Sequence, residues 1–458
     1  MKMNKVTKIK KMKKTFLTIG LGLFTVVVFG QANQNATYSF SLQQAIDFAL
    51  KNQKDVKNAI IDEELAHEKV NQILGAGLPQ INGNFDVKDF IEVPTSVVEA
   101  KNFGGPPGVY SALKFGLQYQ TSAGFDVSQL LFSSDYFLGL KASKLYVELS
   151  TKATQRTKTE TTAILSKAYY TVLINQERSK LMDANIARVK KAVDDTKALF
   201  ENGFVEKLDY DRLTVTYNNL LVEQEKVQRL LELGAYLLKY QMGMDINSSL
   251  ILTDKLEDVK FNITNLSADK FDYTKRVEYN LVETQFQLAK LDLKRNKLAF
   301  LPTAVAYGSL SETAMRSKLD MFQHSTPWYP TGLIGGKITM PLFTGLRGHS
   351  TTQQARLKLM QSENNLDFIK KTIDLDIASS STILKNATSS LDNQKKNIAI
   401  AEDVVHVSKL KYEQGVGSNL ELISSETALK EAQTNYYNAL FDAIVAKIDF
   451  DKANGILK

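Results

Sequence analysis

The chain has 458 residues, a hydrophobic fraction of 43% and a formal net charge of +7. Residues 1–30 hold seven lysines and no acid, so 7 − 7 leaves the remainder neutral, and the charge does not point to a nucleic-acid partner. The absence of cysteine excludes disulfides and a lipid anchor on an acylated cysteine.

Residues 1–30 have the pattern of a secretory signal peptide. The lysines precede an apolar run from Phe16 to Phe29, and small residues follow at Gly30 and Ala32. The run is shorter than the roughly 20 apolar residues of a transmembrane helix. We therefore expect export and cleavage after Gly30 or Ala32, with an uncleaved amino-terminal anchor as the alternative.

Two long tracts, 108–301 and 342–458, contain no proline and are rich in Ala, Leu, Lys, Glu and Gln. This composition predicts long helices. A helix over Asp135–Phe200 alone would measure roughly 100 Å at about 1.5 Å per residue. The molecule should therefore be elongated.

The sequence contains two similar halves, 31–250 and 251–458. The turn Asn202-Gly203-Phe204-Val205 has its counterpart at Gln414-Gly415-Val416-Gly417, 212 residues later (414 − 202). Leu-Pro pairs at 78–79 and 301–302 end a helix in each half. Each half is predicted as a helix, two strands, a very long helix, a glycine turn and a second long helix. The turns form the tips of two helical hairpins, at about 200–212 and 412–424.

The second helix of each hairpin carries mainly apolar or small residues at alternating spacings of four and three, which favours packing along a seam with another helix. In the first half these are Leu213, Tyr217, Leu220, Gln224, Val227, Leu231, Gly234 and Leu238; in the second they are Ser425, Leu429, Ala432, Tyr436, Ala439, Ala443, Ala446, Phe450 and Ala453.

Four strands are predicted, at about 80–91, 111–129, 303–311 and 331–343. Polar and apolar residues alternate over Ile81–Lys88 and, for about fifteen residues, over Leu113–Val127. Soluble strands usually alternate over fewer residues, whereas transmembrane barrel strands need about 9–11. A half-buried strand of a soluble protein is the alternative.

Four strands do not close a barrel, and open sheet edges are excluded from lipid. Three copies would supply 3 × 4 = 12 strands, an even number within the usual range. The predicted fold class is therefore an α+β membrane protein, with duplicated helical hairpins and a β-barrel assembled from several protomers, which is 12-stranded if the assembly is trimeric.

In this order, the motifs resemble the TolC family of outer-membrane efflux proteins. They include a strand exit, Pro341-Leu342-Phe343-Thr344-Gly345, and a turn with Tyr412, Gly415, Ser418 and Glu421. The resemblance covers residues 40–456. It implies a homotrimer in outer-membrane lipid, with a helical tunnel in the periplasm. It also implies two partners, a periplasmic adaptor and an inner-membrane pump of RND or ABC type.

The resemblance implies that the hairpin tips form a closed entrance. Glu421 matches a position where the family places acids that narrow the pore, and Asp209 is its counterpart in the first half. Tyr412 sits where a tyrosine bonds across the tip, with Asp209 as the expected acceptor. Gly203, Gly415 and Gly417 form the turns, and Gly417 replaces an arginine found in some relatives. Alternatively, Glu421 and Asp209 are ordinary acids in the first turn of a helix.

The sequence shows no catalytic constellation. It lacks cysteine, and His67, His324, His349 and His406 do not have metal-ligand spacing. We expect no enzyme activity, cofactor or metal. An exported coiled-coil scaffold or adaptor is the rival interpretation, which leaves the long amphipathic strands unexplained.

Overall fold

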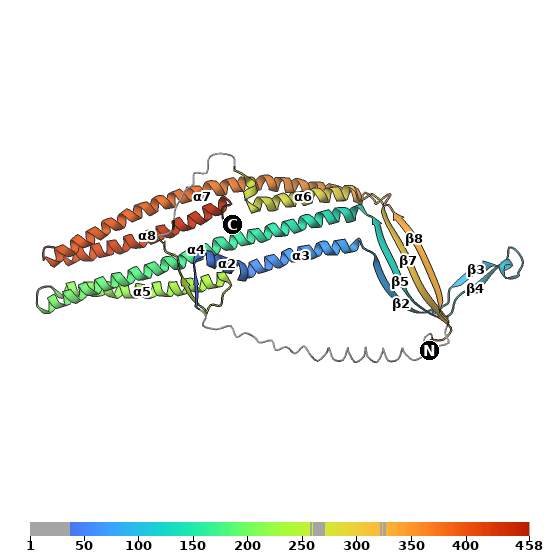
Figure 1. The fold of residues 1–458 in the computed structure, drawn as a ribbon, viewed down its shortest axis with the longest axis horizontal. Helices are drawn as coiled ribbons and strands as arrows, with labels where there is room; N and C mark the ends of the chain where they lie inside the picture. Colours follow the sequence, from blue (N-terminus) through green and yellow to red (C-terminus); the bar gives the residue numbers. More distant parts are fainter. Residues whose placement is uncertain (1–36, 257–258, 260–270, 321–322, 324–326, 458) are drawn as a thin grey trace, which may run out of the picture.

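The computed structural model describes residues 37–256, 259, 271–320, 323 and 327–457. The predicted signal peptide at 1–30 lies outside these residues. Figure 1 shows an elongated molecule in which long helices run side by side. Four strands lie toward one end, and two helical turns form the other.

The helices form two antiparallel hairpins, α4 with α5 and α7 with α8, as predicted. α4 has 68 residues and α7 has 67. The predicted seam residues Leu213, Leu429 and Phe450 are all buried. The helices are α2 (Leu42–Asn52), α3 (Lys54–Ala76), α4 (Ser134–Glu201), α5 (Lys207–Met242), α6 (Val277–Lys297), α7 (Arg347–Glu413) and α8 (Asn419–Ala453).

The two hairpins meet along α4 and α8. Ala163 and Ile174 of α4 are buried in one apolar cluster with Leu440, Ile444 and Ile448 of α8. In Figure 1, α3 and α6 extend the same layer toward the strands. The layer therefore has two edges, one formed by α3 and α5 and the other by α7.

Four antiparallel strands form one sheet in the order β2-β5-β7-β8. They are β2 (Gln80–Asp89), β5 (Tyr119–Phe132), β7 (Thr303–Arg316) and β8 (Tyr329–Thr339). β2 and β8 are the edge strands, and Pro330 in β8 is tolerated there because an edge strand has donors without a partner in the sheet.

The register places apolar side chains of all four strands on one face of the sheet. Phe125 lies opposite Leu310, and in the next row Ile81, Val127, Gly308 and Ile334 follow one another across the strands. These apolar side chains are exposed in the single chain, Ile334 at 96%. Between these two apolar rows, one row of paired residues points to the opposite face of the sheet. It consists of Asn82, Asp126, Ser309 and Leu333, of which the first three are polar.

The strand predicted at 111–129 is not continuous, and this prediction was wrong. It is divided into β4 (Tyr110–Lys114) and β5, with Gly116 between them at φ +113°. That conformation suits glycine and interrupts the strand. β4 pairs with β3 (Thr95–Glu99), which was not predicted, and Figure 1 shows this small hairpin projecting beyond the sheet.

The second pair of strands also differs in extent from the prediction at 303–311 and 331–343. β7 continues to Arg316, and β8 ends at Thr339. The chain turns after β8 because Gly345 and Leu346 both have positive φ, +61° and +64°, directly before α7.

A short parallel sheet in the middle of the molecule joins the two halves. β1 (Thr37–Phe40) pairs with β6 (Ser249–Leu252). The buried Tyr169 of α4 donates its hydroxyl to the carbonyl of Phe40 at 3.1 Å. Burial raises the pKa of Tyr169 from its ordinary value of 10 to about 12, so the hydroxyl stays protonated even at high pH.

Candidate functional site

The two hairpin tips lie next to each other at the end of the molecule away from the strands (Figure 1). Gly203 and Gly415 have φ of +79° and +73°, so both turns use a left-handed conformation that favours glycine. Gly417 serves a different purpose. A Cβ at this position would lie 2.8 Å from the Cβ of Lys411, so the second turn is too tight for a larger residue.

The tips are joined by a contact that the sequence did not predict. Asn419, the first residue of α8, donates its side-chain amide to the carbonyl of Asp209 at 2.9 Å and to its carboxylate at 3.2 Å. Asn419 is buried, and its own side-chain oxygen has no hydrogen-bond partner among the described residues. Nothing in the local pattern marks Asn419, since Lys207 occupies the corresponding first position of α5.

Tyr412 does form a bond between the hairpins, but not with Asp209. Its hydroxyl lies 3.2 Å from that of Thr196 on α4, and either group can donate. Thr196 is fully buried. The seam of α4 runs through Asn185, Val189 and Ala192 at spacings of four and three, and the next step reaches Thr196, so extending the helical spacing would have found it.

Glu421 lies in the first turn of α8, as the helix-end interpretation requires. Its backbone amide donates to the N-cap hydroxyl of Ser418 at 3.1 Å. Its half-exposed carboxylate pairs with Lys411 of the preceding helix at 3.1 Å. The charge of Glu421 is therefore partly offset within its own hairpin.

A polar cluster lies farther from the tip, between α4 and α8. Arg188 binds the carboxylate of Glu426 at 2.7 Å, and Asn185 donates to Gln433 at 2.9 Å. Arg188 also donates to Asn185 at 2.9 Å, so the four side chains are connected. Asn185 and Gln433 are both buried, and such groups hold a fixed register because each needs its partner.

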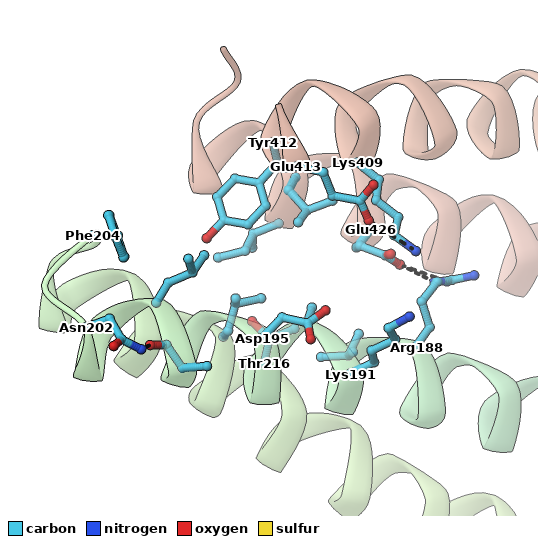
Figure 2. A pocket seen from close by; sticks show the side chains of 17 residues that line it. Arg188, Lys191, Asp195, Asn202, Phe204, Thr216, Lys409, Tyr412, Glu413 and Glu426 are labelled. Atoms are coloured by element: carbon cyan, nitrogen blue, oxygen red, sulfur yellow. Dashed lines mark hydrogen bonds and ion pairs between the residues drawn. The ribbon is translucent and has the colours of Figure 1, made fainter. Parts of the chain in front are cut away.

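A pocket of about 470 Å³ lies between this polar cluster and the turns. Figure 2 shows Arg188, Lys191, Lys409 and Glu426 at one end of it, and Asn202 and Phe204 at the other. All four helices of the two hairpins contribute to its walls.

In the described part of the chain, His, Asp and Glu side chains form no group of three or more that would hold a metal ion. Within the same ranges, every helix lacks an apolar stretch long enough to cross a membrane.

Comparison with known proteins indicates the family to which this chain is similar. A family profile described as outer membrane efflux protein matches residues 282–455. The outer membrane protein TolC of Salmonella enteritidis is 20% identical over 458 residues, spanning 98% of this chain and 87% of TolC. Over nearly its whole length, the chain is similar to proteins of the TolC family.

Two further relatives have related names. The probable efflux pump outer membrane protein TtgC of Pseudomonas putida is 22% identical, over 91% of this chain and 83% of that protein. The Campylobacter jejuni CmeC outer membrane channel has the same fold, with a TM-score of 0.71 at 17% identity, covering 91% of this chain and 86% of CmeC.

The likeness to these outer-membrane proteins places the chain in the outer membrane, with its helical part in the periplasm. These relatives are outer-membrane channel and efflux proteins rather than enzymes. The rival interpretation as a coiled-coil scaffold does not account for this kinship.

Proposed function

We propose that three copies of this TolC-like chain close into an exit duct that carries substrates from the periplasm to the exterior. The observation that carries this proposal is that β2 and β8 are the two edge strands of the sheet formed by the described residues. Lipid does not tolerate open sheet edges, so β8 of one protomer needs β2 of the next. Three sheets of four strands then make a barrel of 3 × 4 = 12 strands.

The edges of the helical layer support the same closure. On α5, Val222 and Tyr240 are 66% and 71% exposed, and on α7, Phe368 and Leu375 are 68% and 67% exposed. Exposed apolar side chains along a helix edge favour burial against another chain. Joining α3 and α5 of one protomer to α7 of the next would cover both edges and continue the tunnel below the barrel.

We infer further that the tip faces a periplasmic adaptor and an inner-membrane pump of RND or ABC type. TtgC, whose name describes an efflux pump component, supports this class of partner. Phe204 at the turn is 77% exposed and offers a site for a photoreactive residue. Crosslinking from position 204 in cells should capture an adaptor; crosslinks to other copies of the chain alone would contradict this partner.

We propose that the bond between Tyr412 and Thr196 keeps the entrance closed, so Tyr412→Phe should raise conductance in planar bilayers. A neutral hydrogen bond contributes about 1 kcal/mol, and its loss should shift the ratio of separated to joined hairpins about fivefold in each protomer. Tyr210→Phe is the matched control, because Tyr210 stacks on Phe200 at the same tip. If the two variants conduct equally, Tyr412 does not help to keep the entrance closed.

We propose that three copies of Glu421 line the entrance and favour cations. Glu421→Gln should lower cation selectivity in planar bilayers, and Lys411→Gln should raise it, because the lysine offsets the same carboxylate. Opposite shifts in reversal potential would support a pore-lining ring. If neither variant changes selectivity, Glu421 is a helix-end acid and the constriction lies elsewhere.

A further inference from the structure

The pocket between the hairpins has the dimensions and lining of a small-molecule site. Its volume of about 470 Å³ falls within the range of about 300–1,000 Å³ that is typical of ligand pockets. Its walls include three apolar side chains that are at least 95% buried, Val189, Leu213 and Leu422. Phe204 and Tyr412 add two aromatic rings toward the turns (Figure 2).

The charges around the pocket cancel. The lining includes three basic side chains, Arg188, Lys191 and Lys409, and three acidic ones, Asp195, Glu413 and Glu426. Arg188 is bound to Glu426 at 2.7 Å, and Lys409 lies 3.9 Å from Glu413. An ionic ligand would find no net charge of opposite sign, so affinity has to come from burying apolar surface.

The pocket also depends on how the hairpins are arranged. One wall comes from α4, α5 and their turn, and the other from α7 and α8. Contacts between hairpins occur on both sides of it, at Arg188–Glu426 and at Asn419–Asp209. Separating the tips would pull the walls apart, so a ligand that touches both walls would bind the closed arrangement better.

We propose that this pocket binds an uncharged, drug-sized aromatic molecule, which holds the two hairpins of a protomer together. The effect on the entrance rests on the function proposed above, whereas the binding does not. The site therefore offers a point where a small molecule regulates opening from within the protein.

Binding can be measured by energy transfer from an indole placed at the pocket. The chain has a single tryptophan, Trp328, near the strands. The double variant Trp328→Phe/Phe204→Trp therefore carries one indole, at the tip. The probe is N-phenyl-1-naphthylamine, an uncharged molecule that absorbs where indole emits. Detergent surrounds the strands, roughly 100 Å away along α4, so probe dissolved in the micelle is too distant to contribute.

The expected result is saturable quenching of the indole that does not depend on salt. Ala192→Phe, which fills the pocket, should weaken binding at least about tenfold, and Ala198→Phe should do the same from another position on α4. Ala428→Phe is the control, because Ala428 is exposed on α8 outside the pocket. If energy transfer to the probe does not saturate, or is equally strong in Ala192→Phe and Ala198→Phe, the pocket is not the binding site.

The second readout tests the effect on the entrance. The probe should return the conductance of the Tyr412→Phe channel toward that of the unchanged protein. If energy transfer saturates but the probe leaves the conductance of the Tyr412→Phe channel unchanged, the ligand does not hold the hairpins together. If no variant conducts at all while energy transfer is intact, the proposed duct fails and the binding site stands.

Discussion

Replacing Arg276 with alanine is expected to destabilise the protein by at most about 3–5 kcal/mol per protomer, because it removes the buried member of two ion pairs whose carboxylates are partly exposed. The Arg276 side chain is 7% exposed and binds Glu278 at 2.9 Å and Asp376 at 3.3 Å. It also donates to the carbonyl of Ala453 at 2.8 Å. One side chain thus joins the start of α6, the middle of α7 and the end of α8.

The loss should depend on pH. Burial raises the pKa of Glu278, but the hydrogen bond and charge of Arg276, together with a backbone hydrogen bond and the charge of Lys452, outweigh it, and the net pKa is lowered. A lowered pKa contributes stability above the ordinary glutamate pKa, and this is lost as pH falls through the folded value. Without Arg276, the pKa of Glu278 would be higher than in the unchanged protein, because only the backbone hydrogen bond and Lys452 would still oppose the effect of burial. The difference in stability between the unchanged protein and Arg276→Ala should therefore be largest at neutral pH and shrink on acidification.

Thermal unfolding of the detergent-extracted protein, followed from pH 4 to pH 8, measures both effects. Arg229→Ala is the matched control, since the Arg229–Glu225 pair is exposed and such pairs contribute about 0–1 kcal/mol. A pH-independent loss, or a loss no larger than that of Arg229→Ala, would contradict the role assigned to Arg276.

Leu310→Arg should sharply reduce the amount of protein assembled in the outer membrane. Leu310 lies in the middle of β7 on the apolar face, opposite Phe125, and is 63% exposed in the single chain. Arginine facing lipid near the middle of the bilayer costs about 2–4 kcal/mol, and a trimer contains three copies.

The neighbouring residue provides the control. Ser309 points to the opposite face, in the row that contains Asp126, and this face should line the watery interior. Ser309→Arg should assemble at nearly the normal level. Quantifying the protein in purified outer membranes compares the two variants directly, and equal yields would show that the apolar face is not turned toward lipid.

The regular features of this fold could be predicted because they repeat locally. Proline-free tracts indicated α4 and α7, and the alternation over Ile81–Lys88 indicated β2. The break at Gly116 was missed because the apolar and polar residues on both sides stay in phase, so the pattern looks uninterrupted. The pairing of β1 with β6 was missed because four-residue strands far apart in the chain carry almost no local signal.

The site was harder to predict than the fold because its contacts join different helices. The partner of Tyr412 depends on how α4 and α7 are rotated against each other. Packing between the hairpins brings Thr196 to the tyrosine and leaves Asp209 to Asn419. Sequence identified the turns through Gly203 and Gly415, whose backbone conformation is a local property.

The mass of the assembled protein tests the central claim most directly. Outer membranes should be washed with carbonate, extracted with a mild detergent and examined by native mass spectrometry. The proposed duct requires a complex of three chains that appears only in the detergent extract, because β2 and β8 must pair between protomers. A single chain with its strands intact by circular dichroism, or a protein released by carbonate alone, would contradict it.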